Sequence, residues 1–147
     1  MFRGSAPAKI DDKGRLKIPT GFRRQLDERY ASDELFITSL TGDAALVYPL
    51  SVWEEMEARL LALPSTHPSR NRFLARVNYY GQQVRLDGQG RALVPQILRE
   101  VADIQGEVVV VGELDHLVVR NHEKYAGQLA GDPFTDEDAR TLSELGI

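Results

Sequence analysis

The chain has 147 residues, no cysteine and a formal net charge of −4. Its length suits one compact domain, and the lack of cysteine excludes disulfides, thiol nucleophiles and cysteine-based zinc sites. No apolar run approaches the roughly 18 to 20 residues that a membrane span requires, and the first ten residues lack the apolar centre of a signal peptide, so we expect a cytoplasmic protein without a membrane partner.

The net charge conceals two basic blocks. Residues 1–24 carry seven basic and two acidic side chains, and residues 70–99 carry six arginines and one aspartate, so each block has a net charge of +5. Residues 25–69 and 100–147 carry net charges of −6 and −8. A nucleic-acid-binding protein needs only one basic face, so this segregation is compatible with DNA binding. Ordinary solvated surface charge is the alternative interpretation.

Residues 2–10 open the chain as a predicted edge strand. Pro7 lacks the N–H group that an inner strand would need for pairing, and an edge position tolerates this loss. Phe2, the first residue of this strand, is a candidate for contacts between subunits, with packing inside the chain as the alternative.

The next stretch occurs twice, as IDDKGRLKIP at residues 10–19 and as LDGQGRALVP at residues 86–95. At an offset of 76 the polar and turn-forming positions coincide, namely Asp11 with Asp87, Gly14 with Gly90, Arg15 with Arg91 and Pro19 with Pro95. Glycine adopts positive φ without steric cost, which predicts a tight turn between two short strands. Proline ends the second strand and favours the first turn of a short helix.

Each copy is expected to present one arginine beside its turn. Side chains alternate along a strand, so Arg15 and Arg91 point outward when their apolar neighbours point inward. Asp11 and Asp87 are expected to shape the turns, either by accepting backbone N–H bonds or by orienting the arginine. The alternative is that both arginines are purely structural, each locked to its aspartate.

The sequence pattern between the first repeated stretch and the linker predicts a helix, a hairpin and a second helix. Residues 20–28 have apolar side chains at helical spacing, and residues 35–48 read as two strands joined by a turn. Ser51 and Glu54 have the spacing of a capping box that opens the next helix. Trp53 of that helix is assigned to the core or to subunit packing rather than to ligand stacking.

The second half begins with a linker and then repeats the order of the first. We expect a helix at residues 68–79, a strand at 80–86 and a hairpin at 107–120. The helix at 68–79 carries Arg70, Arg72 and Arg76, which either extend a basic surface or simply solvate a connecting helix. Thr135 is the predicted N-cap of a short helix near the acidic end of the chain.

The doubled D-x-x-G-R stretch, the opening MFRG and the YPLSVW segment together resemble the MraZ family of bacterial regulators, and the likeness covers nearly the whole chain. The resemblance implies an α+β, β-rich fold: two tandem AbrB-like copies of the swapped-hairpin, β-barrel type form one pseudo-two-fold unit with short helices. The expected division is a first copy at 1–64, a linker and connecting helix at 65–79, a second copy at 80–130 and an acidic C-terminal tail or short helix at 131–147.

The resemblance also implies sequence-specific binding of double-stranded DNA, for which the two turn arginines have suitable chemistry. A guanidinium group can donate two parallel hydrogen bonds to O6 and N7 of guanine, and a two-stranded ribbon fits the major groove. We therefore assign base contacts to Arg15 and Arg91. Phosphate contacts are assigned to the surrounding cations, namely Lys9, Lys13, Lys17, Arg23, Arg85 and Arg99.

The second copy is less basic than the first, because Gln89 replaces Lys13 and Leu93 replaces Lys17. Either the two halves bind DNA unequally, or the second turn serves partly in assembly, where an outward leucine would be accommodated. The candidate subunit contacts are Phe2, Tyr48, Trp53 and Leu93.

The family likeness further implies a ring-shaped homo-oligomer that reads short direct repeats. It implies a nucleoid-associated repressor at the promoter of the division and cell-wall gene cluster, including the regulator's own gene. The alternatives are an AbrB-like antitoxin and a non-catalytic oligomeric scaffold. No enzyme, metal or cofactor is expected, because the sequence contains no P-loop, nucleophile elbow or dinucleotide turn, and His116 and His122 have no metal-ligand spacing.

Overall fold

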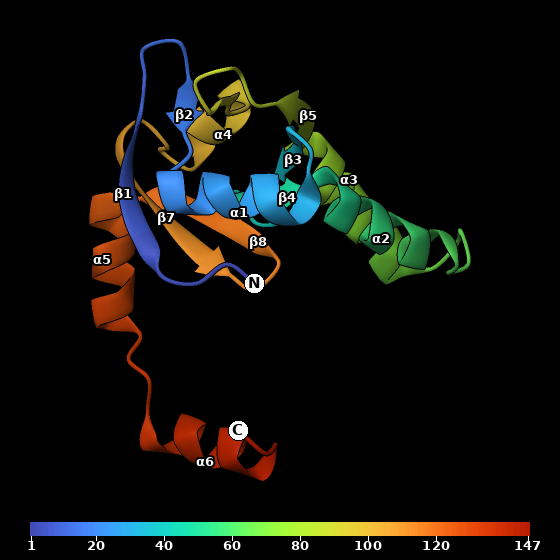
Figure 1. Cartoon of the computed structure of the whole chain (residues 1–147). Helices are drawn as coiled ribbons and strands as arrows, with labels where there is room; N and C mark the ends of the chain where they lie inside the picture. Colours follow the sequence, from blue (N-terminus) through green and yellow to red (C-terminus); the bar gives the residue numbers. More distant parts are fainter.

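The computed structural model describes all residues from 1 to 147, and these form eight strands and six helices (Figure 1). The strands are β1 (Ser5–Ile10), β2 (Arg15–Lys17), β3 (Glu34–Thr38), β4 (Ala45–Pro49), β5 (Gln82–Arg85), β6 (Arg91–Leu93), β7 (Gly106–Glu113) and β8 (His116–Asn121). The helices are α1 (Thr20–Tyr30), α2 (Leu50–Leu61), α3 (Pro68–Tyr79), α4 (Gln96–Val101), α5 (His122–Gly131) and α6 (Asp136–Glu144).

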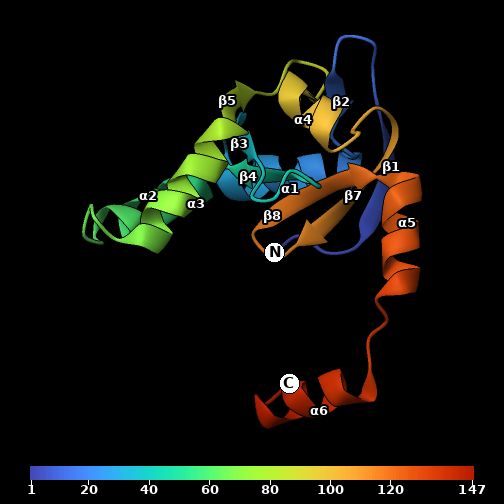
Figure 2. The same ribbon diagram turned by 180° about the vertical axis from the view of Figure 1, so that it is seen from behind.

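The eight strands form one antiparallel sheet in the order β5-β3-β4-β8-β7-β1-β2-β6. The sheet curls until its two end strands, β5 and β6, contact each other, which produces a nearly closed barrel (Figure 2). The predicted β-rich α+β fold with short helices is therefore confirmed.

The two motif copies exchange strands rather than folding separately. Strand β2 of the first copy pairs with β6 of the second copy. Strand β1 of the first copy pairs with β7 of the second, and the equivalent strand β5 of the second copy pairs with β3 of the first. The strand junctions are reciprocal: the Ile18 N–H donates to Gly90 O and the Val94 N–H donates to Gly14 O, each at 3.0 Å. A pseudo-two-fold axis therefore passes between β2 and β6 and between β4 and β8.

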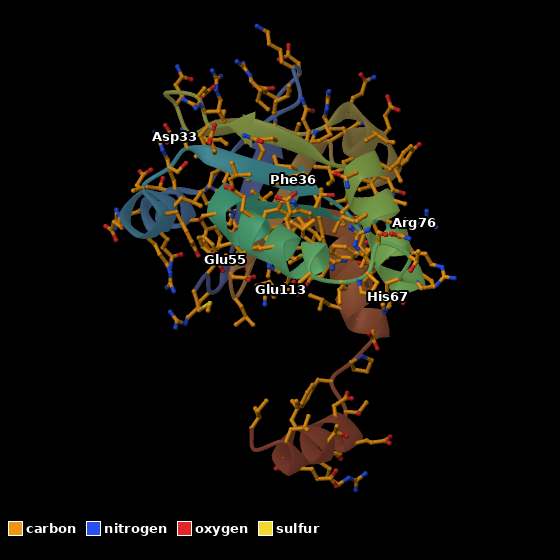
Figure 3. All side chains as sticks on the ribbon, turned by 90° about the vertical axis from the view of Figure 1, so that its right-hand side faces the viewer. Asp33, Phe36, Glu55, His67, Arg76 and Glu113 are labelled. Atoms are coloured by element: carbon orange, nitrogen blue, oxygen red, sulfur yellow. The ribbon has the colours of Figure 1, made fainter.

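The barrel core draws on both copies. Alternation along β2 and β6 buries Leu16 and Ala92 completely while their neighbours remain partly or fully exposed. A smaller cluster forms between α2 and the sheet, where Phe36 lies (Figure 3). Trp53 stacks on Phe36 with ring centroids 4.6 Å apart. Trp53 is thus a core residue, which was one of the two roles assigned to it.

The predicted helices and hairpins are present, with one error at a helix start. The predicted helix at 68–79 has the same bounds as α3, and the predicted hairpins are β3–β4 and β7–β8. The predicted capping box is wrong, because α2 begins at Leu50 with Pro49 as N-cap, and Ser51 lies inside the helix without a capping bond. Pro49 supplies a fixed φ at the boundary, so the helix starts two residues earlier than a cap at Ser51 would allow.

The predicted edge position of the first strand is also wrong, since β1 lies between β7 and β2. However, β2 pairs with β1 only at Ile10, so one side of residues 5–9 is unpaired. The Gly112 N–H donates to Gly4 O, so Gly4 directs its backbone polar groups toward β7. This direction alternates from one residue to the next along a strand, and the nitrogen of Pro7, three residues later, therefore points away from β7. Proline is tolerated because its nitrogen faces the unpaired side.

Three of the four candidate subunit contacts are buried within the chain. Phe2 packs against Phe22 and Tyr30, and Tyr48 and Trp53 are similarly covered. These three side chains are therefore not available for contacts between subunits, and they pack inside the chain instead. Leu93 remains exposed, because it lies on the outer face of β6.

Two parts of the chain project from the barrel. The α2–α3 hairpin extends from one side, and α5 packs on β7 and β8 at the other side before leading to α6, which lies apart from the rest of the molecule (Figures 1 and 2). None of the helices is both long and apolar enough to span a membrane.

Candidate nucleic-acid interface

The first turn is organised by one carboxylate. Asp11 Oδ1 accepts hydrogen bonds from the backbone N–H groups of Lys13, at 3.0 Å, and Arg15, at 2.8 Å. Its other oxygen, Oδ2, accepts from Nε of the Arg15 side chain at 2.8 Å. Gly14 closes the turn with a φ of 84°, and its N–H donates to Asp11 O. Asp11 therefore holds both the backbone of the turn and the direction of the arginine.

The second turn has the same construction. Asp87 Oδ1 accepts from the backbone N–H groups of Gln89 and Arg91, both at 2.9 Å, and Oδ2 accepts from Arg91 Nε at 2.8 Å. Gly90 has a φ of 75°. Because no bond length differs between copies by more than about 0.1 Å, the two turns present their arginines in the same way.

The hydrogen bonds to these carboxylates lower the pKa of both groups. The backbone N–H of Arg15 is the largest cause for Asp11, and the backbone N–H of Arg91 is the largest cause for Asp87. Desolvation raises both pKa values and so opposes this effect, but it is outweighed. Both aspartates therefore remain ionised well below neutral pH.

Each arginine keeps its outer edge free. The bond to aspartate uses Nε, and neither Nη group of Arg15 or Arg91 has a hydrogen-bond partner within the chain. The side chains of Arg15 and Arg91 are 30% and 26% exposed to solvent. The structural role and the binding role are thus compatible, because Nη1 and Nη2 can donate to a ligand while Nε stays with the carboxylate.

Both turns lie on the same side of the barrel (Figure 1), at opposite ends of the ribbon that the antiparallel strands β2 and β6 form. In this ribbon Arg15 is opposite Leu93, and Lys17 is opposite Arg91. We call these four residues the outer strip of β2–β6. Like charges that face each other across a sheet are unfavourable, and a bound anion would relieve the repulsion between Lys17 and Arg91.

Two of the arginines assigned to phosphate cross to the turn of the other copy. Arg99 of α4 lies over Gly14, and its Nε donates to Val94 O at 3.1 Å. Arg23 of α1 lies over Gly90, and its Nη2 donates weakly to Gly88 O at 3.5 Å. Both side chains therefore support a turn. Arg23 and Arg99 were predicted to contact DNA phosphates. The repeat shows that they occupy equivalent positions 76 residues apart, but it does not show that each crosses to the other turn.

The remaining cations assigned to phosphate lie around the turns. Lys13 is at the tip of the first turn and Lys17 is on the outer strip, both exposed. Lys9 and Arg85 occupy equivalent positions just before the two motifs, on β1 and β5. Arg85 forms an ion pair with Glu34 at 3.0 Å, so part of its charge is neutralised.

The histidines do not form a metal site. No group of three or more histidine, aspartate or glutamate side chains lies close enough to hold a metal ion. His116 pairs with Asp115 at 2.8 Å and stacks on Tyr48 at the opposite hairpin. Burial, together with Asp115 and Glu113, raises the pKa of Tyr48 to about 12. Tyr48 is therefore a neutral packing residue.

Comparison with known proteins identifies relatives along the full chain. Residues 1–76 and 81–145 match a family model described as "MraZ protein, putative antitoxin-like". A protein of Koribacter versatilis named Transcriptional regulator MraZ is 50% identical over 147 residues, covering 100% of both chains. A protein of the same name from Acidobacterium capsulatum is 49% identical over the same span, and one from Pseudomonas putida is 37% identical over 133 residues, covering 90% of this chain and 87% of its own.

Proposed function

The chain belongs to the MraZ family, and from this membership together with the paired turns we propose that it is a sequence-specific DNA-binding transcriptional regulator. The observation that carries the proposal is the β2–β6 ribbon, which presents Arg15 and Arg91 from two identical aspartate-held turns on one side of the barrel. The names of the curated relatives support the same function.

Base recognition is assigned to the free edges of the two arginines. A ribbon of two strands fits the major groove, where Nη1 and Nη2 can donate to O6 and N7 of one guanine. Asp11 and Asp87 fix the side chains before DNA arrives, so less conformational entropy is lost on binding. Lys13 and Lys17 would contact phosphates beside the ribbon and so position it without reading sequence.

The other cations have different surroundings, and we propose different roles for them. We assign a phosphate contact to Lys9, and we propose that Arg23 and Arg99 influence DNA binding mainly through the turns that they cover. Arg85 would have to leave Glu34 to bind a phosphate. The two copies are unequal on this surface because Gln89 and Leu93 replace the lysines of the first copy.

A homo-oligomer is part of the proposal because one chain offers too few base contacts. Two bidentate contacts supply about 2 to 6 kcal/mol of discrimination, against about 4 to 10 kcal/mol for a typical specific regulator. Joined subunits raise the effective concentration of neighbouring ribbons when the DNA repeats are spaced to match. We therefore propose a closed ring that reads short direct repeats, since an open head-to-tail contact would grow into filaments.

The proposed target is the promoter of the division and cell-wall gene cluster, including the protein's own gene, where bound protein would repress transcription. We accordingly propose that the protein is cytoplasmic and associated with the nucleoid, and that it has no catalytic activity and no cofactor. The proposed division of the chain is the one expected above, with two copies at 1–64 and 80–130 that share one barrel.

A mobility-shift assay with the DNA upstream of the protein's own gene tests the proposal, with a scrambled fragment of equal length as control. We expect the upstream fragment to shift at lower protein concentration, and the shift to weaken steeply between two salt concentrations. Equal weak binding to both fragments would favour a scaffold with incidental basic faces. An antitoxin would in addition co-purify with a second protein of fixed stoichiometry.

A further inference from the structure

The β2–β6 ribbon is nearly symmetric, but its outer strip is not. The pseudo-two-fold axis exchanges Arg15 with Arg91, and the two arginines are held alike. The same rotation exchanges Lys17 with Leu93, which differ in charge and in length. One end of the strip therefore pairs an arginine with a leucine, and the other end pairs an arginine with a lysine.

This asymmetry bears on the kind of DNA site proposed above. A symmetric ribbon fits a palindromic site and binds it in either direction, because the two-fold axis of the protein coincides with that of the DNA. A direct repeat, in contrast, has to be bound in the same direction at every copy. Recognition of direct repeats therefore requires a difference between the two ends of the ribbon, and the outer strip has such a difference on the face assigned to DNA.

Leu93 is an apolar side chain in cationic surroundings. It is 43% exposed, and the other members of the outer strip are Arg15, Lys17 and Arg91. A partner that covers this strip has to be anionic to satisfy the three cations, and it has to offer an apolar group to the leucine. The major groove of DNA meets both requirements, because phosphates line its walls and the C5-methyl group of thymine lies on its floor.

The register places Leu93 beside the guanine assigned to Arg15. The two residues are directly opposite each other in the antiparallel pair and lie on the same face of the ribbon. Side chains in such a pair have Cβ atoms about 5 Å apart, and stacked base pairs are about 3.4 Å apart, so Leu93 lies over a base pair about one or two steps from that guanine.

We propose that Leu93 contacts the C5-methyl group of a thymine beside the guanine bound by Arg15, and that this contact makes the ribbon directional. The assignment rests on the DNA-binding function proposed above and adds a residue that reads sequence. Leucine has no hydrogen-bonding group, so it distinguishes bases by apolar contact, and thymine is the base with an apolar group in the major groove. At the other end of the strip, the longer Lys17 reaches a phosphate and reads no base.

The test removes the methyl group from the DNA. Deoxyuridine keeps the hydrogen-bonding groups of thymine and lacks the C5-methyl group, so each thymine of the upstream site is replaced in turn and the affinity is measured by fluorescence anisotropy. We expect the wild-type protein to lose affinity about fourfold at one position of a repeat, which corresponds to the burial of one methyl group. Leu93→Ala should bind the thymine and deoxyuridine duplexes equally at that position.

Leu129→Ala is the matched control, because Leu129 is an exposed leucine on α5, outside the ribbon. This variant should keep the difference between the two duplexes. A second variant, Leu93→Lys, gives the second copy the residue that the first copy has at this position. It should lose the response to deoxyuridine and raise the magnitude of the salt slope by about 0.9 for each subunit engaged. Because Leu93 is exposed, both substitutions should leave the circular dichroism spectrum unchanged.

The possible results separate this contact from the proposed function. Specific binding of the upstream fragment without a response to deoxyuridine at any thymine would overturn the role of Leu93 and leave the DNA-binding function intact. A response that persists in Leu93→Ala would assign the methyl contact to another residue and overturn the proposal as well. Equal binding to the upstream and scrambled fragments would overturn both. A lower assembly mass of Leu93→Ala, in light scattering coupled to size exclusion, would assign Leu93 to a subunit contact instead.

Discussion

The guanidinium group of Arg99 covers Gly14, a residue of the other motif copy, so closely that a Cβ atom on Gly14 would lie 2.4 Å from Arg99 Cζ. Arg23 covers Gly90 in the equivalent way. Each turn is therefore completed by the helix that follows the opposite motif. Because the two turns also share the β2–β6 ribbon, a disturbance of one copy is expected to reach the other.

We predict that Gly14→Ala destabilises the protein. Its φ of 84° is unfavourable for alanine by about 1 to 2 kcal/mol, and the new methyl group would also displace Arg99. Urea unfolding followed by circular dichroism measures the loss. Gly88→Ala is the matched control, because no atom lies within 4 Å of its added Cβ and its φ is not positive. Equal stability of the two variants would contradict the role of the turn conformation.

Removal of the outward arginines should abolish specific DNA binding without unfolding the protein. Arg15→Ala and Arg91→Ala each remove one bidentate contact, worth about 1 to 3 kcal/mol, and the loss multiplies when several subunits bind together. The aspartates left behind are partly exposed and can be hydrated. Fluorescence anisotropy with upstream DNA measures the affinity, and Arg29→Ala at the exposed end of α1 is the control. Unchanged affinity in the folded variants would eliminate these base contacts.

Lys17→Ala should weaken binding to all DNA sequences alike. Lys17 is exposed on the outer strip and forms no ion pair, so its expected partner is phosphate. The slope of log affinity against log salt should fall in magnitude by about 0.9 for each subunit engaged. Lys124→Ala is the control, because Lys124 lies on α5 and its charge is already paired with Asp103 at 3.3 Å. A slope that Lys17 does not affect would place this lysine away from the DNA.

The turn aspartates predict a loss of stability in acid. The pKa values of Asp11 and Asp87 are lowered from 3.8 in the folded state, so the unfolded chain binds protons first as the pH falls. The two aspartates contribute fully to the free energy of unfolding when the pH is above their pKa in the unfolded chain. This contribution is lost as the pH falls through their lower pKa values in the folded protein. Asp11→Ala should therefore be less stable than wild type at neutral pH, and the difference should shrink below about pH 4.

Asp12→Ala provides the comparison for this pH dependence. It removes the same charge from the neighbouring exposed position, and the side chain of Asp12 makes no hydrogen bond in the turn. Thermal unfolding between neutral and acidic pH should show a converging difference for Asp11→Ala only. The same curve for both variants would assign the effect to net charge rather than to the hydrogen bonds of Asp11.

Most local elements of this protein can be predicted from its amino-acid sequence. The repeated stretch, its turns at Gly14 and Gly90 and the helix at residues 68–79 depend on side chains within a few positions of one another, which a pattern can reveal. The bonds from Asp11 and Asp87 to arginines four residues along the chain were foreseen for the same reason. The family resemblance then supplied the exchange of strands in outline.

The way in which the two copies meet cannot be predicted from the sequence in this manner. The pairing of β2 with β6 and the crossing of Arg23 and Arg99 depend on the register between segments about 76 residues apart, which no local pattern specifies. Burial of Phe2 follows likewise, because its ring is covered by α1 rather than by its neighbours in sequence. Side chains acquire such partners only when the barrel closes, since the packing of distant segments, not local preference, selects them.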